Sequence, residues 1–215
     1  MAHSPQCPSV RRLISLLHAT RGRPQQALIV RAQWLGTADH PEQIEHIFAV
    51  DGDDAETLEA TADLRRVVVR KPKGCFRAYN LAAKKATGDI LFPIEDDLMA
   101  PAHWDTLTLE AFAGHSEPAA MLVDDSLGNT AIEWVFNRAF VEARGLYSDD
   151  YWGLFGDTEL RERLRKDGVT RLPSRLLLDH RHHSRGLAQF DETYHRKGLR
   201  YGEEMAVYER RKASW

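Results

Sequence analysis

Residues 80–97 read Asn-Leu-Ala-Ala-Lys-Lys-Ala-Thr-Gly-Asp-Ile-Leu-Phe-Pro-Ile-Glu-Asp-Asp, and this segment is the part of the sequence that best indicates the fold. Residues 75–86 have a helical pattern, and Gly88 follows as a typical helix terminator. The apolar run 89–94 predicts a buried strand, which ends at three consecutive carboxylates, Glu95, Asp96 and Asp97. A helix, a strand and an acidic turn in direct succession indicate one unit of an α/β fold.

The chain before this stretch shows the same alternation. Strands are predicted at residues 13–17, 44–50 and 67–69, and Pro24 opens a helix between the first two. This order predicts an α/β fold with a Rossmann-like, mostly parallel sheet flanked by helices in a single domain. Ligands bind such sheets outside the carboxyl ends of the strands, and the polar clusters 20–23, 51–54 and 95–97 all fall there.

The second half of the chain is less regular. Helices are predicted at 103–113, 137–144 and 157–166, and strands at 120–123 and 176–178. The helix at 157–166 has the clearest pattern, because Leu160 and Leu164 share one face and Gly168 follows. After His180 the sequence is polar, and it predicts no regular structure.

Composition narrows the class of protein. The chain has 215 residues, 43% of them hydrophobic, which suits one globular domain with a sizeable core. A net charge of −3 gives no global attraction to nucleic acid, although the basic residues in 161–212 suit a local anionic partner. Cys7 and Cys75 form no disulfide framework, which favours a reducing compartment. Without a signal peptide or apolar span, we expect a soluble, cytoplasmic protein whose membrane contact is at most peripheral.

The carboxylates after the fourth strand predict a metal site. Side chains alternate along a strand, so Glu95 and Asp97 should point the same way. Two aligned carboxylates suit Mg²⁺ or Mn²⁺ with open positions for phosphate oxygens. The alternative is an acidic turn on a solvated surface, and the position at the ligand edge of the sheet argues against it.

This stretch resembles the family 2 type of GT-A glycosyltransferase, which carries an Asn in a helix, Ala-x-Gly-Asp, an apolar strand and a DXD motif. Glu95-Asp96-Asp97 matches DXD with Glu in the first place. Residues 15–24 resemble the family's first strand and Thr/Arg/Pro loop, and residues 50–54 its second strand and acidic turn. The resemblance covers about residues 12–195. It implies an N-terminal tail (1–10), a GT-A domain (11–195) with a nucleotide-sugar-binding half (11–100) and an acceptor-binding half (101–195), and a C-terminal tail (196–215).

The resemblance also implies the donor site. The donor would be a nucleotide-sugar, most simply a UDP-sugar, bound with Mn²⁺ or Mg²⁺. Asp51 would accept a hydrogen bond from the nucleobase, Asp97 would ligate the metal, and Glu95 would contact the ribose or reach the metal through water. The donor-binding residues implied are Thr20, Arg21, Asp51, Asp53, Lys73, Asn80, Glu95 and Asp96. For the basic residues among them, and for the loop 70–73, a solvated surface is an equal alternative.

The start of the helix at 157–166 offers a catalytic base. The family places an acidic pair there; Asp157 matches its Asp, and Gly156 stands where Glu is usual. A carboxylate at this point would take the proton of the acceptor hydroxyl and imply inversion at the sugar carbon. Helix capping by Asp157 is the structural alternative. Asp124 and Asp125 are a second acidic pair, for which a surface turn is the simpler interpretation.

A histidine cluster follows the last predicted strand. Family members use one His of this region as a further ligand to the DXD metal, and we favour His182, with His180 next. The alternative is a polar lid whose histidines contact phosphate or nothing. A zinc or nuclease-type site is the weakest hypothesis, because no second ligand cluster has suitable spacing.

These features predict a metal-dependent, inverting glycosyltransferase. A metal-dependent nucleotidyltransferase is disfavoured, because the loop after the first strand has one glycine, Gly22, rather than a glycine-rich sequence. A non-catalytic module that binds a sugar nucleotide or glycan stays open. The short second half resembles small enzymes of bacterial and phage origin. The acceptor would then be a glycan or a hydroxymethylated base in phage DNA, which the basic segments 161–175 and 195–200 would suit.

Overall fold

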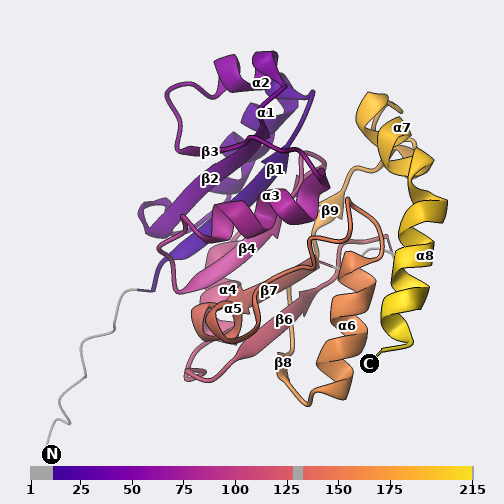
Figure 1. Ribbon diagram of the computed structural model, residues 1–215. Helices are drawn as coiled ribbons and strands as arrows, with labels where there is room; N and C mark the ends of the chain where they lie inside the picture. The colour runs from indigo at the N-terminus through magenta and orange to yellow at the C-terminus, as the bar shows by residue number, and fades with distance from the viewer. Residues whose placement is uncertain (1–11, 128–132, 215) are drawn as a thin grey trace, which may run out of the picture.

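The computed structural model describes residues 12–127 and 133–214. The expected N-terminal tail, residues 1–10, lies outside this part of the chain. The described residues form one seven-stranded sheet in the order β3-β2-β1-β4-β7-β6-β8, together with a two-stranded ribbon of β5 and β9 (Figure 1).

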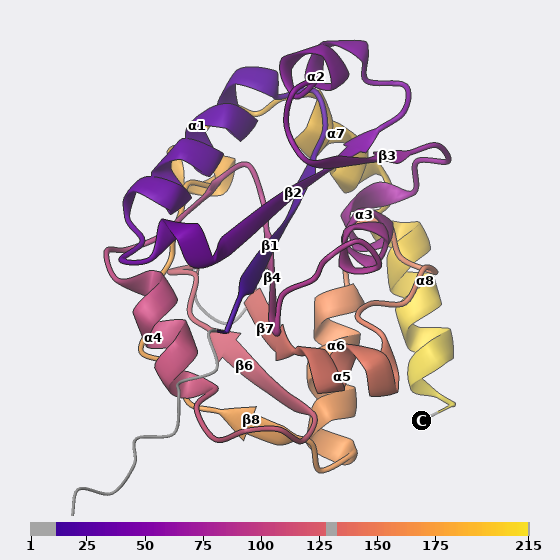
Figure 2. The same cartoon turned by 90° about the vertical axis from the view of Figure 1, so that its left-hand side faces the viewer.

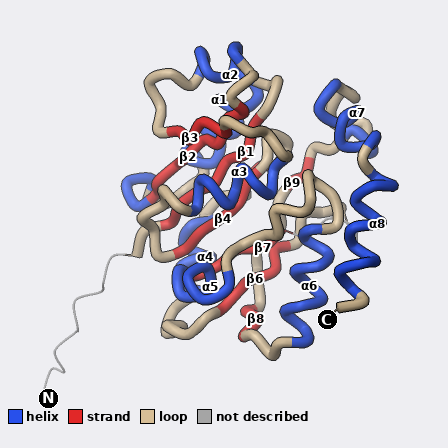
Figure 3. Tube along the Cα trace, in the orientation of Figure 1, coloured by secondary structure: helices blue, strands red, loops and turns tan. Residues whose placement is uncertain are grey.

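The strands alternate with helices through the first half of the chain and less regularly afterwards (Figure 3). The strands are β1 (Ile14–Thr20), β2 (Ile44–Asp51), β3 (Arg66–Val69), β4 (Ile90–Ile94), β5 (Leu98–Met99), β6 (Ala119–Val123), β7 (Glu133–Asn137), β8 (Thr170–Leu172) and β9 (Asp179–His180). The α-helices are α1 (Pro24–Gly36), α2 (Ala55–Ala60), α3 (Gly74–Ala83), α4 (Trp104–Ala111), α5 (Arg138–Arg144), α6 (Gly156–Lys166), α7 (Glu192–Leu199) and α8 (Tyr201–Lys212). Short 3₁₀ helices occupy Pro41–Gln43 and His183–Arg185.

The sheet is mostly parallel, as the sequence predicts. β1 pairs in parallel with β2 on one side and with β4 on the other, and β3 continues the parallel order beyond β2. Among the described strands of this sheet, β7 alone runs antiparallel to its neighbours, β4 and β6. The carboxyl ends of β1, β2 and β4 therefore meet at one edge, and they bring together the three polar clusters that follow them.

Helices cover both faces of the sheet (Figure 2). On one face, α1 and α4 pack through Trp34 and Trp104 against Phe92 of β4. On the other face, α3, α5, α6 and α8 cover a second apolar cluster that includes Phe136 and Phe140. The α/β fold and its two-faced core are thus those expected from the alternating apolar pattern.

The end of the chain differs most from what the sequence predicts. Residues 196–214, expected to be a tail, belong to α7, α8 and the residues next to them. Figure 1 shows both helices lying beside the domain, with α7 near the carboxyl edge of the sheet. The polar surface residues of these helices leave no clear helical pattern in the sequence. Tyr194 and Tyr208 are nevertheless buried and anchor the two helices.

Two smaller corrections concern strands. The strand predicted at 176–178 is displaced: Leu177 forms only an isolated bridge to Asp124, and the paired residues are Asp179–His180. The strands β7 and β8 were not predicted. β8 has three residues, too few for a clear alternating pattern, and β7 is the antiparallel strand that the parallel rule does not anticipate.

Candidate active site

The acidic cluster at the end of β4 divides into two directions. Glu95 and Asp97 point the same way, as predicted, and a carboxylate oxygen of each lies within 4.8 Å of the other and of a His180 ring nitrogen. Asp96 points elsewhere. Its Oδ1 is 2.9 Å from His18 Nε2, and its Oδ2 accepts a hydrogen bond of 3.1 Å from the Thr20 hydroxyl. Asp96 thus joins the acidic turn to the end of β1.

The ribbon of β5 and β9 brings His180 to these carboxylates. Leu98, directly after Asp97, pairs with His180, and the Arg181 N–H donates to the Asp97 carbonyl oxygen at 2.7 Å. On the other side of the ring, His180 Nδ1 is 2.8 Å from Asp125 Oδ2. This contact orients the imidazole so that Nε2 faces the carboxylates. Asp125 is fully buried and supports the site, whereas the sequence favoured a surface turn.

The three residues fit a divalent cation. Asp97 Oδ1 and His180 Nε2 are buried side-chain atoms without a hydrogen-bond partner in the described structure. Buried polar atoms normally have a partner, so these two are available to a ligand. Two carboxylates and an imidazole match the ligands of Mn²⁺ and Mg²⁺ enzymes, with the imidazole favouring the softer ion. Glu95, Asp97 and His180 would therefore hold the metal.

Electrostatics couple Asp97 to its neighbours. Burial alone would raise the pKa of Asp97, but the His180 ring and the Tyr194 hydroxyl hold it well below its usual range. Tyr194 donates this bond from α7 to Asp97 Oδ2 at 2.6 Å. Burial alone would lower the pKa of His180, but the carboxylates of Asp125 and Asp97 raise it to about 10. Asp97 is thus an ionised carboxylate beside the imidazolium of His180. A bound divalent cation would take the place of the imidazolium proton as the positive charge next to Asp97.

His182, our first choice from the sequence, does not join this group. Its Nδ1 accepts the Ser184 N–H at 3.2 Å, and burial lowers its pKa to about 4. The strand register explains the difference. His180 lies within β9 and faces the acidic turn, whereas His182 caps the following 3₁₀ helix.

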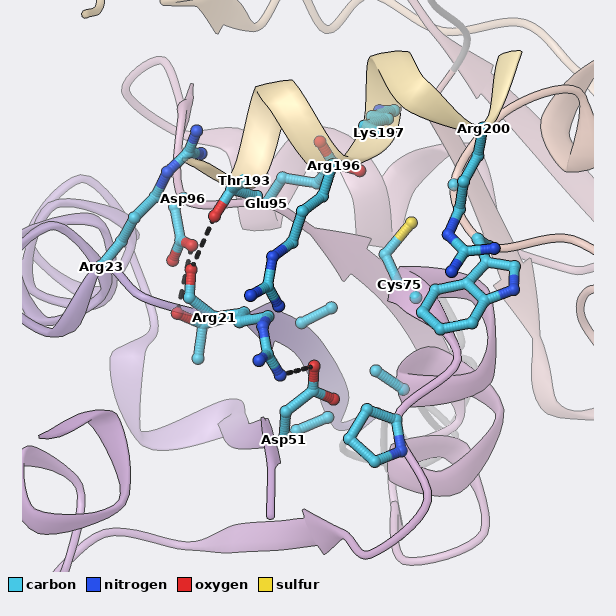
Figure 4. Close-up of a pocket in the computed structure, with 18 of the residues that line it drawn as sticks. Arg21, Arg23, Asp51, Cys75, Glu95, Asp96, Thr193, Arg196, Lys197 and Arg200 are labelled. Atoms are coloured by element: carbon cyan, nitrogen blue, oxygen red, sulfur yellow. Dashed lines mark hydrogen bonds and ion pairs between the residues drawn. The ribbon is translucent and has the colours of Figure 1, made fainter. Parts of the chain in front are cut away.

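A cavity of about 700 Å³ opens at the carboxyl edge of the sheet (Figure 4). Its floor comes from β1, β2 and the start of α3, and one side comes from α7. Arg21 spans this floor and donates to Asp51 at 2.7 Å and to Asp53 at 2.9 Å. Burial raises the pKa of Asp51, and Arg21 opposes that shift. Six predicted donor-binding residues line the cavity: Thr20, Arg21, Asp51, Asp53, Glu95 and Asp96.

Two predicted donor-binding residues lie elsewhere. Asn80 is used by the fold: its side chain donates to the Tyr147 carbonyl oxygen and accepts the Tyr147 N–H, at 2.8 and 3.1 Å. Asn80 therefore holds a loop of the second half. Lys73 is the N-cap of α3, and it is the neighbours Pro72 and Gly74 that line the cavity.

Gly74 is required where it stands. It has a φ of +74°, and a Cβ there would lie 1.6 Å from the Trp152 carbonyl oxygen. A side chain at this position would therefore separate α3 from the loop that borders the cavity.

A second cavity, of about 1,020 Å³, contains Asp157. Glu95, Gly153, Lys197 and Leu199 line both cavities, so the two meet beside the metal ligands. Burial raises the pKa of the Asp157 carboxyl, opposed by the Thr158 N–H. The N-cap of α6 is Phe155, in the left-handed region with a φ of 62°, and it forms no side-chain cap. Asp157 lies inside the first turn rather than at the N-cap, and its carboxylate faces a cavity.

Close packing explains why Gly156 stands at the position where the family carries Glu. A Cβ at this position would lie 2.7 to 2.9 Å from the Phe76 ring, so the start of α6 contacts α3 closely. Glu159 does not compensate as a second catalytic acid. It is buried and bonded to Arg211 and Tyr151, and therefore has a structural role.

Helix α7 contributes to the site, which the polar sequence after His180 does not predict. Its face carries Thr193, Arg196 and Lys197 to the first cavity. A signal for this helix exists: Asp191 caps it by accepting the Tyr194 N–H at 3.1 Å, and an Asp three residues before a buried aromatic is a helix start pattern.

Comparisons with known proteins identify the family and the fold of the chain. A family model described as glycosyl transferase family 2 matches residues 29–165. Among solved structures, the mannosyltransferase PcManGT from Pyrobaculum calidifontis, in complex with GDP-Man and Mn²⁺, is similar with a TM-score of 0.64 at 17% identity. That match covers 80% of this chain and 58% of the other. TarS from S. aureus is similar with a TM-score of 0.63 at 11% identity, over 79% of this chain and 37% of the other.

At these identities the likeness shows the fold alone, and it confirms the expected GT-A fold. The chain spans under two thirds of the length of either solved structure. A search of curated proteins gives no significant match. Among the described residues, no helix is both long enough and apolar enough to span a membrane.

Proposed function

The chain belongs to glycosyl transferase family 2, and from this premise we propose that it transfers a sugar from a nucleotide-sugar to an acceptor hydroxyl in a metal-dependent, inverting reaction. This matches the enzyme class expected from the sequence. One observation carries the proposal: the ligand group Glu95, Asp97 and His180 lies where two cavities meet, and a half-buried carboxylate, Asp157, faces the second.

The first cavity suits the donor. Asp51 at its floor would accept the imide N–H of a uracil, which displaces Arg21 from that carboxylate, and we therefore propose a UDP-sugar. A guanine offers a similar N–H, so a GDP-sugar is the matched alternative. The sugar would extend toward the junction of the cavities, beside Glu95. A divalent cation held by Glu95, Asp97 and His180 would supply charge that stabilises the leaving diphosphate.

The second cavity suits the acceptor. Asp157 would take the proton of the acceptor hydroxyl, whose oxygen forms the new bond to the anomeric carbon as the carbon–oxygen bond to the diphosphate breaks. The proton ends on the Asp157 carboxylate, and the electron pair of the broken bond leaves with the nucleoside diphosphate. Attack from the side opposite the leaving group inverts the anomeric carbon.

Aromatic side chains favour a glycan as acceptor. Phe155, Phe190 and Tyr201 line the second cavity, and aromatic faces pack well against the C–H faces of sugar rings. If the acceptor is instead a base in duplex DNA, the reaction would slow steeply as salt rises, because phosphate contacts would dominate binding. A salt-insensitive rate with glycan acceptors supports the glycan.

The test is nucleotide release from a panel of UDP- and GDP-sugars, with Mn²⁺ and with a chelator. The parent chain should release nucleotide only with metal, and Asp97→Ala should lower that rate by about 10³- to 10⁴-fold. Asp179→Ala is the matched control, because Asp179 is exposed on the same ribbon and bonds to Arg181. Metal-independent release, or an equal loss in both variants, would contradict the proposed site.

A further inference from the structure

Lys197 occupies the junction of the two cavities. It is carried by α7, and its side chain is one of four that line both. A Cβ at Gly153 would lie 3.5 Å from Lys197 Cε, so the aliphatic stem runs along that backbone. Figure 4 shows α7 above the first cavity, with Lys197 and Arg200 on the side opposite Asp51, whereas the Arg196 side chain extends down toward Arg21. A donor that fills the first cavity would therefore pass beneath Lys197.

The other basic residues of the donor cavity are already paired. Arg21 bonds to Asp51 and Asp53, and Arg23 bonds to Asp191 at 2.6 Å. Arg196 bonds to Glu192 at 2.8 Å, while Arg200 bonds to Glu203 and lies 3.6 Å over the Trp152 ring. Of the five cationic residues that line this cavity, Lys197 alone forms no hydrogen bond or ion pair within the described structure.

Lys197 is charged and surrounded by acidic groups. Glu95 raises the pKa of its ammonium above the usual value, with smaller contributions from Asp97 and Asp157. None of these carboxylates forms a salt bridge with it. The ammonium therefore stays charged, and its three N–H donors, which bond to none of these carboxylates, can bind an anionic ligand.

The chemistry at the junction identifies that ligand as a diphosphate. A compact ammonium on a flexible stem can donate three hydrogen bonds to phosphate oxygens as their position changes during bond breaking. Resting on the proposed function, we propose that Lys197 binds the donor diphosphate and stabilises the charge that the nucleoside diphosphate gains as it leaves. This role would make α7 part of the donor site.

The experiment compares a nucleoside diphosphate with its nucleoside. Binding of UDP and uridine, and of GDP and guanosine, is measured by calorimetry with and without Mn²⁺ for the parent, Lys197→Met and Lys197→Arg. We expect Lys197→Met to weaken diphosphate binding by about 10- to 100-fold and to leave nucleoside binding unchanged. Lys197→Arg should retain most of the affinity, because it keeps the charge.

Arg210→Met is the control for loss of one positive charge, since Arg210 is exposed on α8 and lines neither cavity. Thermal melting checks that each variant is folded. An equal loss of diphosphate and nucleoside affinity in Lys197→Met would indicate a packing role and overturn the inference, as would unchanged diphosphate affinity. If the parent binds no diphosphate at all, the proposed function fails and the inference falls with it.

Discussion

The first half of this molecule is organised by regular strand pairing, whereas the second half depends on a few contacts between distant residues. In residues 14–94, β1 to β4 pair in parallel, and the sequence pattern predicts each of these strands together with α1 and α3, although it does not place α2. In residues 101–127 and 133–212, strands are short, β7 and β9 run antiparallel to their partners, and α7 and α8 complete the site. The floor of the first cavity is therefore set by repeated local structure, and the positions of His180, Asp157 and α7 by a few long-range contacts.

The difference between the two regions indicates how the side chains of the candidate site are positioned. Glu95 and Asp97 are aligned by the geometry of a strand end, which any chain with this pattern would share. His180 and Asp157 reach the same point through the β5–β9 ribbon and the α6 start, each dependent on a few contacts. If variants of His180 and Asp157 kept full activity, the long-range contacts that position these residues would have no functional importance.

The largest effect should come from the proposed base. Asp157→Asn should slow sugar transfer by about 10²- to 10⁴-fold while donor binding is retained, because the acceptor hydroxyl loses its proton acceptor. Transfer and diphosphate affinity are measured separately. An Asp167→Asn variant is the control, because Asp167 is exposed at the C-cap of the same helix and lines neither cavity. Equal transfer rates in the parent and Asp157→Asn would remove Asp157 from the mechanism.

The raised pKa of Asp157 leads us to expect that pH affects both the transfer rate and the stability of the fold. Burial raises the pKa of Asp157, so the transfer rate should fall with decreasing pH at a higher pH than for an ordinary Asp base. A raised carboxyl pKa means that the folded state favours the protonated form. The stability from this group is therefore present below its unfolded pKa and lost as pH rises through its folded pKa. At pH 7, Asp157→Asn should melt at a higher temperature than the parent.

The two histidines give the next effect. His180→Ala should weaken Mn²⁺ binding by at least about 100-fold, because it removes a proposed ligand rather than the support of one. His182→Ala should change it little, since that ring bonds to Ser184 and lies outside the ligand group. Calorimetry with Mn²⁺ measures both. The opposite ranking would restore the preference drawn from the sequence.

A third effect concerns α8. The buried carboxylate of Glu204 accepts the N–H groups of Trp152, Gly153 and Leu154, at 2.9, 3.1 and 2.9 Å. Glu204→Ala leaves these donors without their acceptor and should lower the free energy of unfolding by about 2 to 4 kcal/mol. Denaturant unfolding measures this. Glu209→Ala, exposed on the same helix, should have little effect; a comparable loss there would mean that the helix matters only through its charge.

The smallest effect is expected at Asp125. It orients His180 without reaching the ligand group itself, so Asp125→Asn should weaken Mn²⁺ binding by about 10- to 100-fold. Because the amide can still accept from Nδ1, the protein should stay folded. Unchanged metal affinity would show that the ribbon alone orients the imidazole.

Much of the fold and part of the site follow from the sequence. The parallel strands, α6 and the shared direction of Glu95 and Asp97 were predicted because period and strand geometry are local properties. His182 was preferred over His180 because strand register is not readable from a two-residue strand. Asn80 matched a family motif, but its hydrogen bonds to Tyr147 depend on a loop 67 residues away. Lys197 was missed for the same reason, since a polar helix does not reveal which cavity it faces.

The contacts of α7 have a consequence for synthesis on the ribosome. Asp191 bonds to Arg23 and Thr193 bonds to the Arg21 carbonyl oxygen, partners 168 and 172 residues apart. The parallel strands emerge first and have what they need to associate, yet β4 presents an open edge until β7 pairs with it. One wall of the donor cavity is added only when residues near 200 have been made. A nascent chain would therefore form the parallel half of its sheet early and complete the first cavity, the proposed donor site, only late.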